Sequence, residues 1–165
     1  MRRRPSASKQ KNEMVQYKYM NTITIDDFSK VEIRIGTVLQ ATKVPEADRL
    51  IQLILDFGEL EILSQVQDDE KKDSSSLTQN DINRLPELVE KYPGRDVRQI
   101  MSAIAPFYPD PNELVGKQIA VSVNLEPRKF KGYESQGMIM ATDTEDGLIS
   151  LLIPEKKVKA GSKIH

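Results

Sequence analysis

The chain has 165 residues, enough for one domain with tails, and its 24 basic and 25 acidic side chains give a net charge of −1. It has no cysteine, which excludes a disulfide framework, a thiolate metal site and a thiol nucleophile. Its one histidine is the last residue, His165, so a histidine zinc site or a Ser-His-Asp arrangement has no material. No P-loop or GxGxxG motif is present, so we expect a protein that is not an enzyme and needs no cofactor or metal.

The charge is unevenly distributed along the chain. Residues 1–20 carry a net charge of +5, and 126–133 and 155–163 are also basic, whereas 65–97 holds eight acidic and five basic side chains. This distribution is compatible with an anionic partner although the total charge is near zero. No stretch approaches the ~20 apolar residues of a membrane span. We therefore expect a cytoplasmic protein without a membrane partner.

Residues 1–21 are polar, basic and without periodicity, and we expect a disordered arm there, followed by one domain over 22–165. In that domain, residues 31–44 alternate between apolar and polar, which predicts a half-buried strand. Gly36 interrupts the alternation and indicates a bend, as a strand that serves both sides of a small barrel would need. A second strand is predicted over 49–57.

An insertion is expected over 59–97. Its middle, 68–76, is too polar to pack, so we expect part of the insertion to be flexible. Ile82, Leu85 and Leu88 then follow at helical spacing, interrupted by Pro86, which predicts one or two short helices. The insertion is interpreted as a decoration of the domain or as a partner-docking element.

Three further strands are predicted in the second half of the chain, together with a helical turn and a hairpin. Strand three covers 98–104, and a helical turn at 109–116 precedes strand four at 118–124 and strand five at 137–142. A C-terminal hairpin turns at 144–147 and returns over 148–153. The periodicity alone indicates an all-β barrel or sandwich.

The connection between strands four and five is the most informative segment. Residues 124–140 read Asn-Leu-Glu-Pro-Arg-Lys-Phe-Lys-Gly-Tyr-Glu-Ser-Gln-Gly-Met-Ile-Met, a basic loop that contains two aromatic residues. Such a loop suits an anionic polymer whose exposed bases can stack. A solvated surface loop is the alternative interpretation of the same charges.

This segment, with its Asn-Leu-x-Pro-x-Lys-x-x-Gly-x-x-Ser-x-Gly-Met pattern, closely resembles the signature of the tRNA-binding domain appended to many methionyl-tRNA synthetases. The same family includes stand-alone structure-specific tRNA-binding proteins, a yeast synthetase cofactor, an endothelial monocyte-activating cytokine and a bacterial export-related chaperone. Blocks at 23–36, 47–50, 55–58 and 98–105 also resemble the family, so the likeness covers 22–165 apart from the insertion. It implies a five-stranded OB-fold barrel with a short helix between strands three and four.

The resemblance also implies the site. Lys129 matches the family lysine and Arg128 and Lys131 are close to it, while Arg34 and Arg49 stand on the strands that usually form the binding face. Asn124 either binds a ligand or holds the loop through the backbone. Ser135 either donates to a phosphate or a 2′-hydroxyl or caps the loop, and Met138 either contacts a base or ribose or is buried. The expected tRNA site is therefore Arg34, Arg49, Asn124, Arg128, Lys129, Lys131, Ser135 and Met138.

The implied function is tRNA binding by backbone and shape with little sequence specificity, in support of aminoacylation. A methionyl-tRNA synthetase is the expected protein partner. A protein-binding module, like the export chaperone or the cytokine, is the alternative, which the acidic insertion favours. Residues 147–154 are strongly apolar, and an exposed strand of this kind needs a cover. The stand-alone tRNA-binding proteins that the chain resembles pair two barrels through the equivalent C-terminal region. This resemblance, together with the apolar strand, predicts a two-fold homodimer.

Overall fold

The computed structural model describes residues 22–45, 47–60 and 85–165, so the expected basic arm and the polar middle of the insertion lie outside the described residues. The described chain falls into two units, which divide after Lys30. The first unit contains the short helix α1, Ile25–Phe28, whose N-cap Thr24 accepts a hydrogen bond from the Asp27 backbone N–H. The pKa of Asp27 is lowered, chiefly by its hydrogen bond with Lys30. Within the described residues, no helix has the length and apolar character needed to cross a membrane.

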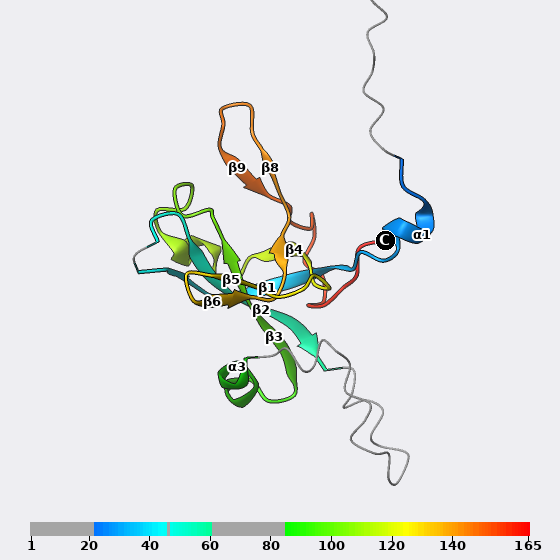
Figure 1. Ribbon diagram of the computed structural model, residues 1–165, viewed down its shortest axis with the longest axis horizontal. Coiled ribbons are helices and arrows are strands. Elements are labelled where there is room, and N and C mark those ends of the chain that lie inside the picture. The colour runs from blue at the N-terminus through cyan, green and yellow to red at the C-terminus, as the bar shows by residue number, and fades with distance from the viewer. Residues whose placement is uncertain (1–21, 46, 61–84) are drawn as a thin grey trace, which may run out of the picture. The chain divides into compact units, whose positions relative to one another are not determined.

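The second unit is built on one curled antiparallel sheet with the strand order β3-β2-β1-β4-β7. Figure 1 labels β1 to β4 of this sheet. These strands are β1 Ile33–Lys43, β2 Ile51–Glu59, β3 Arg95–Ser102, β4 Gln118–Ser122 and β7 Met138–Ile139. The expected all-β class and OB-like architecture are confirmed.

The long first strand β1 has two partners, as the sequence predicted. Ile33 to Thr37 pair with β4, and Thr37 to Lys43 pair with β2, with a register shift between Val38 and Gln40. Thr37 belongs to both pairings, and at the neighbouring Gly36 a Cβ would lie 2.8 Å from the ring of Phe57. Gly36 therefore allows an aromatic ring of the core to approach the backbone of β1.

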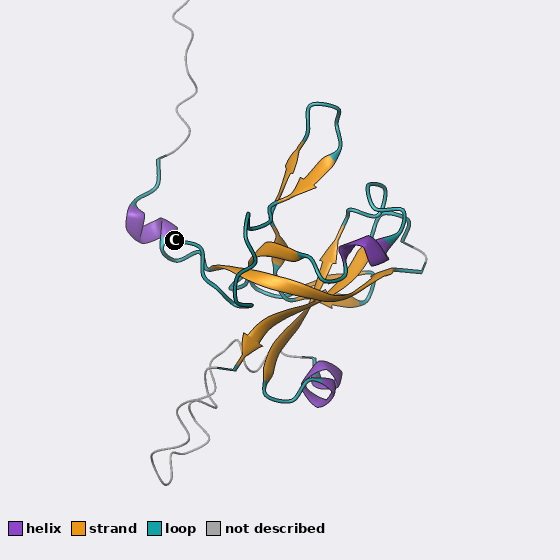
Figure 2. Cartoon of the chain, turned by 180° about the vertical axis from the view of Figure 1, so that it is seen from behind, coloured by secondary structure: helices purple, strands orange, loops and turns teal. Residues whose placement is uncertain are grey.

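Alternate residues of β2 enter two different hydrophobic clusters. Leu53, Leu55 and Phe57 belong to the main core of the barrel. Ile54 points to the other face of the sheet, where it packs with Val97 of β3 and Leu88 of the helix α3, Pro86–Lys91. Figures 1 and 2 show this short helix beside the ends of β2 and β3.

The helix in the insertion differs in detail from its prediction. Pro86 was expected to interrupt a helix, but it begins α3, where its missing N–H has no partner to lose. Because β2 continues to Glu59 and β3 begins at Arg95, the segment between these strands is 60–94. Arg95 and Asp56 form an ion pair at its base, with Arg95 Nε 3.1 Å from Asp56 Oδ1. This hydrogen bond raises the pKa of Arg95.

The helical turn and the C-terminal hairpin follow the predicted order, but the predicted fifth strand is divided. The helical turn is the 3-10 helix η2, Pro111–Leu114, capped by Asp110, and the C-terminal hairpin pairs β8, Ala141–Asp143, with β9, Ile149–Leu151. The predicted single strand over 137–142 is divided into β7 and β8 because each half has a different partner, β4 and β9.

Residues 135–137 close the barrel along the outer edge of β3. The Gln136 backbone N–H donates to the Gln99 carbonyl at 2.9 Å, and the Met101 N–H donates to Ser135 Oγ at 3.0 Å. β3 is an end strand in the strand order, and an open edge would expose unpaired backbone groups. Gly137 lies so close to β4 that a Cβ would be 2.7 Å from the Ser122 carbonyl oxygen.

Gly137→Ala is expected to lower the free energy of unfolding by about 1–3 kcal/mol more than Gly147→Ala does, because the new methyl group meets backbone that cannot move aside. Urea unfolding measures the change. Gly147→Ala is the control: it lies at φ 77° in the β8–β9 turn with nothing within 4 Å of the added carbon, so it carries only the conformational cost of about 1 kcal/mol. Equal losses in the two variants would contradict a tight closure at Gly137.

Candidate nucleic-acid interface

The basic segment between β4 and β7 is a β-hairpin, which the sequence analysis did not predict. Strand β5, Arg128–Phe130, pairs antiparallel with β6, Tyr133–Ser135. The two residues between them, Lys131 and Gly132, have φ values of 51° and 87°. Two successive positive φ angles are the requirement of a type I′ turn, which matches the twist of the strands it joins.

The start of the basic segment is attached to two strands. The buried Arg98 guanidinium, 8% exposed, donates to the Val123 carbonyl at 2.6 Å and to both carboxylate oxygens of Asp96 at 2.9 Å. On the next residue, Asn124 Oδ1 accepts from the Glu32 backbone N–H at 2.8 Å. The backbone that leaves β4 is therefore held in place before the hairpin begins.

The end of the hairpin is attached to β3 mainly through Gln99. Its side-chain amide nitrogen donates to the Glu134 carbonyl at 2.7 Å, and its backbone N–H donates to Gln136 Oε1 at 3.2 Å. Its side-chain oxygen accepts from Gln52 at 2.6 Å. Each polar group of this buried residue has a hydrogen-bond partner, as buried polar groups require.

The hairpin presents three cations to solvent. Arg128, Lys129 and Lys131 are all exposed. Lys129 stands directly opposite Glu134 in the strand register, whereas Arg128 stands opposite the uncharged Ser135. Opposite charges across a strand pair offset each other in part, so the uncompensated positive charge lies at Arg128 and at the turn.

The structure shows the burial or the bonding of three other residues of the expected site, Ser135, Asn124 and Met138. Ser135 is 4% exposed, and its hydroxyl donates to the Gly137 carbonyl at 3.0 Å in addition to its bond from Met101. Asn124 bonds to the backbone, one of its two anticipated roles. Met138 is 53% exposed, so it is accessible to a ligand and is not the buried core residue that was the alternative.

Two arginines of the expected site were predicted to stand on strands; Arg34 does, in β1, but Arg49 lies in the turn before β2, which begins at Ile51. The Arg34 guanidinium is largely covered and donates to Glu32 at 2.6 Å, and Lys163 is 3.6 Å from the same carboxylate. Arg49 is exposed in the turn before β2, and its carbonyl accepts from the Ala105 N–H at 3.1 Å. The structure thus groups Arg128, Lys129 and Lys131 in one hairpin, with Ser135 at its base.

Comparison with known proteins extends this description. The family model "Putative tRNA binding domain" matches residues 87–163. A crystal structure of a MetRS-related protein from Pyrococcus horikoshii is 30% identical, with a TM-score of 0.61, covering 88% of this chain and all of that protein. This chain belongs to the tRNA-binding domain family.

Two further relatives show where such domains occur. The Methionine--tRNA ligase of Parabacteroides distasonis is 38% identical over 160 residues, which are 95% of this chain and 18% of the ligase. The chain therefore spans about a fifth of the length of the curated relatives it matches. The chaperone CsaA of Bacillus anthracis is 26% identical with a TM-score of 0.58, covering 87% of this chain and 99% of that protein.

The sequence analysis missed the residues that position the hairpin of this tRNA-binding domain. Arg98 and Gln99 were assigned only to a strand, and Asp96 only to the insertion. The signal was available, since Asp96 and Arg98 stand two residues apart in a buried strand and thus on one face, where charged groups need partners. The other partner of Arg98, the Val123 carbonyl, is 25 residues away and has no side-chain signature.

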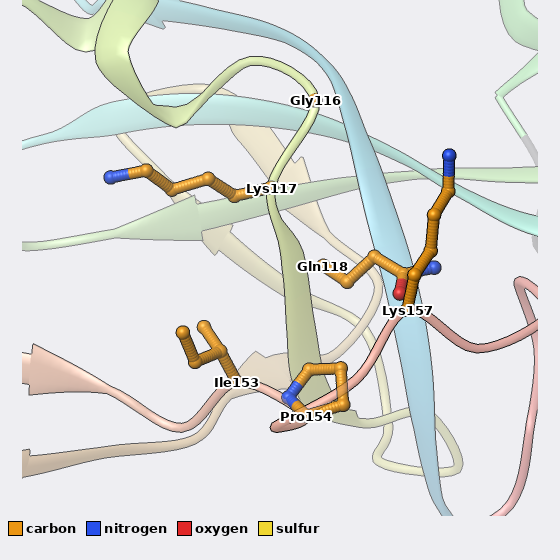
Figure 3. Close-up of a pocket in the computed structure, with 6 residues that line it drawn as sticks. All are labelled: Gly116, Lys117, Gln118, Ile153, Pro154 and Lys157. Carbon is orange, nitrogen blue, oxygen red and sulfur yellow. The ribbon is translucent and has the colours of Figure 1, made fainter.

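A pocket of about 340 Å³ lies between the start of β4 and the C-terminal segment of the tRNA-binding domain. Figure 3 shows its lining residues, Gly116, Lys117, Gln118, Ile153, Pro154 and Lys157. Gln118 is held by two hydrogen bonds to the backbone of Val158. Among the described residues, no acidic side chain lines this pocket, and the lining includes the strongly exposed Ile153.

Lys131→Asn is expected to raise stability and lower the affinity for tRNA. Lysine at φ 51° is strained by about 1 kcal/mol, and Asn-Gly is a preferred type I′ pair, so the substitution should stabilise by about 0.5–1 kcal/mol. The tRNA affinity should fall because one exposed cation is lost. Urea unfolding and tRNA titration measure the two effects. Lys131→Arg, which keeps both charge and strain, is the control, and a parallel loss of stability and affinity in Lys131→Asn would contradict the assignment.

Proposed function

We propose that this tRNA-binding domain grips tRNA by its backbone and shape, with the β5–β6 hairpin as the principal contact. The observation that supports this most directly is the grouping of Arg128, Lys129 and Lys131, all exposed, on a short hairpin attached at both ends to the barrel. Cations on a preformed support bind phosphates without first having to be ordered. The family membership specifies the polyanion as tRNA.

The proposal assigns different roles to the site residues predicted from sequence. The three hairpin cations contact phosphates, and the exposed Met138 on β7 offers a soft surface to a ribose or base. Arg49, exposed in the turn before β2, adds a phosphate contact. Ser135, Asn124 and Arg34 act mainly through the bonds they make within the domain, so they shape the contact surface.

The proposed enzyme partner is a methionyl-tRNA synthetase. The support is the 38% identity to a region that makes up 18% of the Methionine--tRNA ligase of Parabacteroides distasonis. A domain of this kind raises the local concentration of tRNA near the catalytic part, so it serves aminoacylation without taking part in the chemistry. Stimulation of methionyl-tRNA synthesis at low tRNA concentration tests this role. Unchanged aminoacylation with and without the domain would contradict it.

Binding of tRNA is expected to depend strongly on salt. If four to six phosphates are neutralised, the logarithm of the affinity falls against the logarithm of salt concentration with a slope of about −3 to −5. Arg128→Ala and Lys131→Ala should each reduce the slope by about one, and Lys129→Ala by less because Glu134 stands opposite Lys129, whereas Lys91→Ala on helix α3 should leave it unchanged. Filter binding or fluorescence anisotropy measures the slopes. Tighter binding of an unfolded polypeptide than of tRNA would favour a role like that of the CsaA chaperone.

We also propose a two-fold homodimer that uses the C-terminal region. Leu148, Leu152, Ile153 and Val115 are exposed hydrophobic residues, and Ile153 lines the same pocket as Gly116, the neighbour of Val115. Apolar surface of this kind is typical of an interface. Pairing would present two basic hairpins to one tRNA, and bivalent attachment raises the overall affinity without new types of contact.

The dimer predicts a mass near twice 18.7 kDa in light scattering. Ile153→Asp should produce monomers that bind tRNA less tightly, because Ile153 is 61% exposed and its substitution leaves the core intact. Val89→Asp, an equally apolar but separate exposed position on α3, should remain dimeric. A wild-type monomer at micromolar concentration with full tRNA affinity would refute the dimer.

A further inference from the structure

Phe130 is an exposed aromatic residue at the outer end of the basic hairpin. It is 40% exposed, and the other two residues of β5 are exposed cations. A single exposed aromatic side chain is common in proteins and requires no explanation by itself. Its surroundings in the hairpin are what distinguish this one.

The strand register places Phe130 on one face of the hairpin with a second aromatic residue and a cation. Phe130 stands opposite Tyr133, and Arg128 stands opposite Ser135. Because residues alternate between the two faces of a strand, these four share a face, which we call the aromatic face. Lys129 and Glu134 occupy the other face.

The two faces of the hairpin differ in charge. On the aromatic face, Arg128 has no acidic partner in the register, whereas on the other face Lys129 is opposed by Glu134. The positive charge that a polyanion meets is therefore concentrated beside the aromatic rings, with Lys131 at the turn. Arg128 and Phe130 are two residues apart on one strand, about 7 Å, so a single nucleotide can contact both.

The aromatic face is also held in one position. At its base Ser135 is buried and bonded to the backbone of β3, and Tyr133 is half-buried. A ring on such a support loses little freedom when a ligand stacks on it.

We propose that the aromatic face binds one unpaired base of RNA, which stacks on Phe130 while its phosphate pairs with Arg128. Bases within a duplex are stacked on their neighbours and are not available to a side chain, so the ligand is an unpaired nucleotide such as a loop or an end provides. This inference rests on the proposed tRNA binding and adds the part of the RNA that the hairpin holds.

A tryptophan probe tests the stacking directly, since the chain contains no tryptophan of its own. In Phe130→Trp, saturating tRNA should quench the indole fluorescence strongly, because the indole stacks on the base. Val89→Trp, at an exposed position on α3 away from the hairpin and from the proposed dimer surface, should change little. Unquenched indole fluorescence from the Phe130→Trp variant in a saturated complex would overturn the proposal.

Substitutions at Phe130 separate stacking from charge. Phe130→Ala and Phe130→Leu should each weaken binding of tRNA about tenfold, with an unchanged salt slope, whereas Phe130→Tyr should bind normally. The affinity for a blunt RNA duplex should be equal in the three variants and the wild-type protein. Wild-type affinity in Phe130→Ala would overturn the stacking and leave the proposed function intact. Failure of the wild-type protein to bind tRNA with a salt-dependent affinity would remove the proposed function itself.

Discussion

The outer edge of β3 is the constraint on which the rest of this domain depends. β3 is the end strand of the curled five-stranded sheet, so the backbone N–H and C=O groups on its outer side have no neighbouring strand to bond to. Each such group that is buried without a hydrogen-bond partner costs about 1–3 kcal/mol of stability. Here Ser135 and Gln136 satisfy the backbone groups of Gln99 and Met101. The segment that closes the barrel is also the end of the basic hairpin, so the surface proposed to bind RNA is positioned by the same bonds that complete the fold.

A second attachment makes the hairpin rigid from its other end. Arg98 is buried with Asp96 as its ion-pair partner and the Val123 carbonyl as its third contact, and its guanidinium lies 5.5 Å from the centre of the Phe57 ring. Removal of one partner from a buried pair leaves an uncompensated charge, which is strongly destabilising. The pair therefore specifies the position of the backbone where the basic segment begins. With both ends attached, the cations of the hairpin need little ordering when they meet phosphates.

Local patterns predicted most of the strands of the fold, and the missing parts depended on contacts between distant residues. The alternation at 31–44 predicted β1, and the Asp-Pro-Asn sequence predicted the turn at η2. The hairpin inside the basic segment was missed because Lys131 is an unusual first residue for a type I′ turn. The position of Ser135 could not be read from the chain, since its partner Met101 lies 34 residues away. The basic group itself was predictable because its three cations lie within four consecutive residues, 128–131.

Hydrogen exchange of the full chain with and without tRNA is the most direct test of the central claim, that the attached hairpin is the RNA contact. The account predicts that tRNA slows exchange at 128–135 and around Met138, while Gln99 and Met101 are already protected in the free protein by their bonds to 135–136. Protection confined to the β8–β9 hairpin, with unchanged exchange at 128–135, would contradict it. Fast exchange of the Met101 amide in the free protein would contradict the closure on which the hairpin depends.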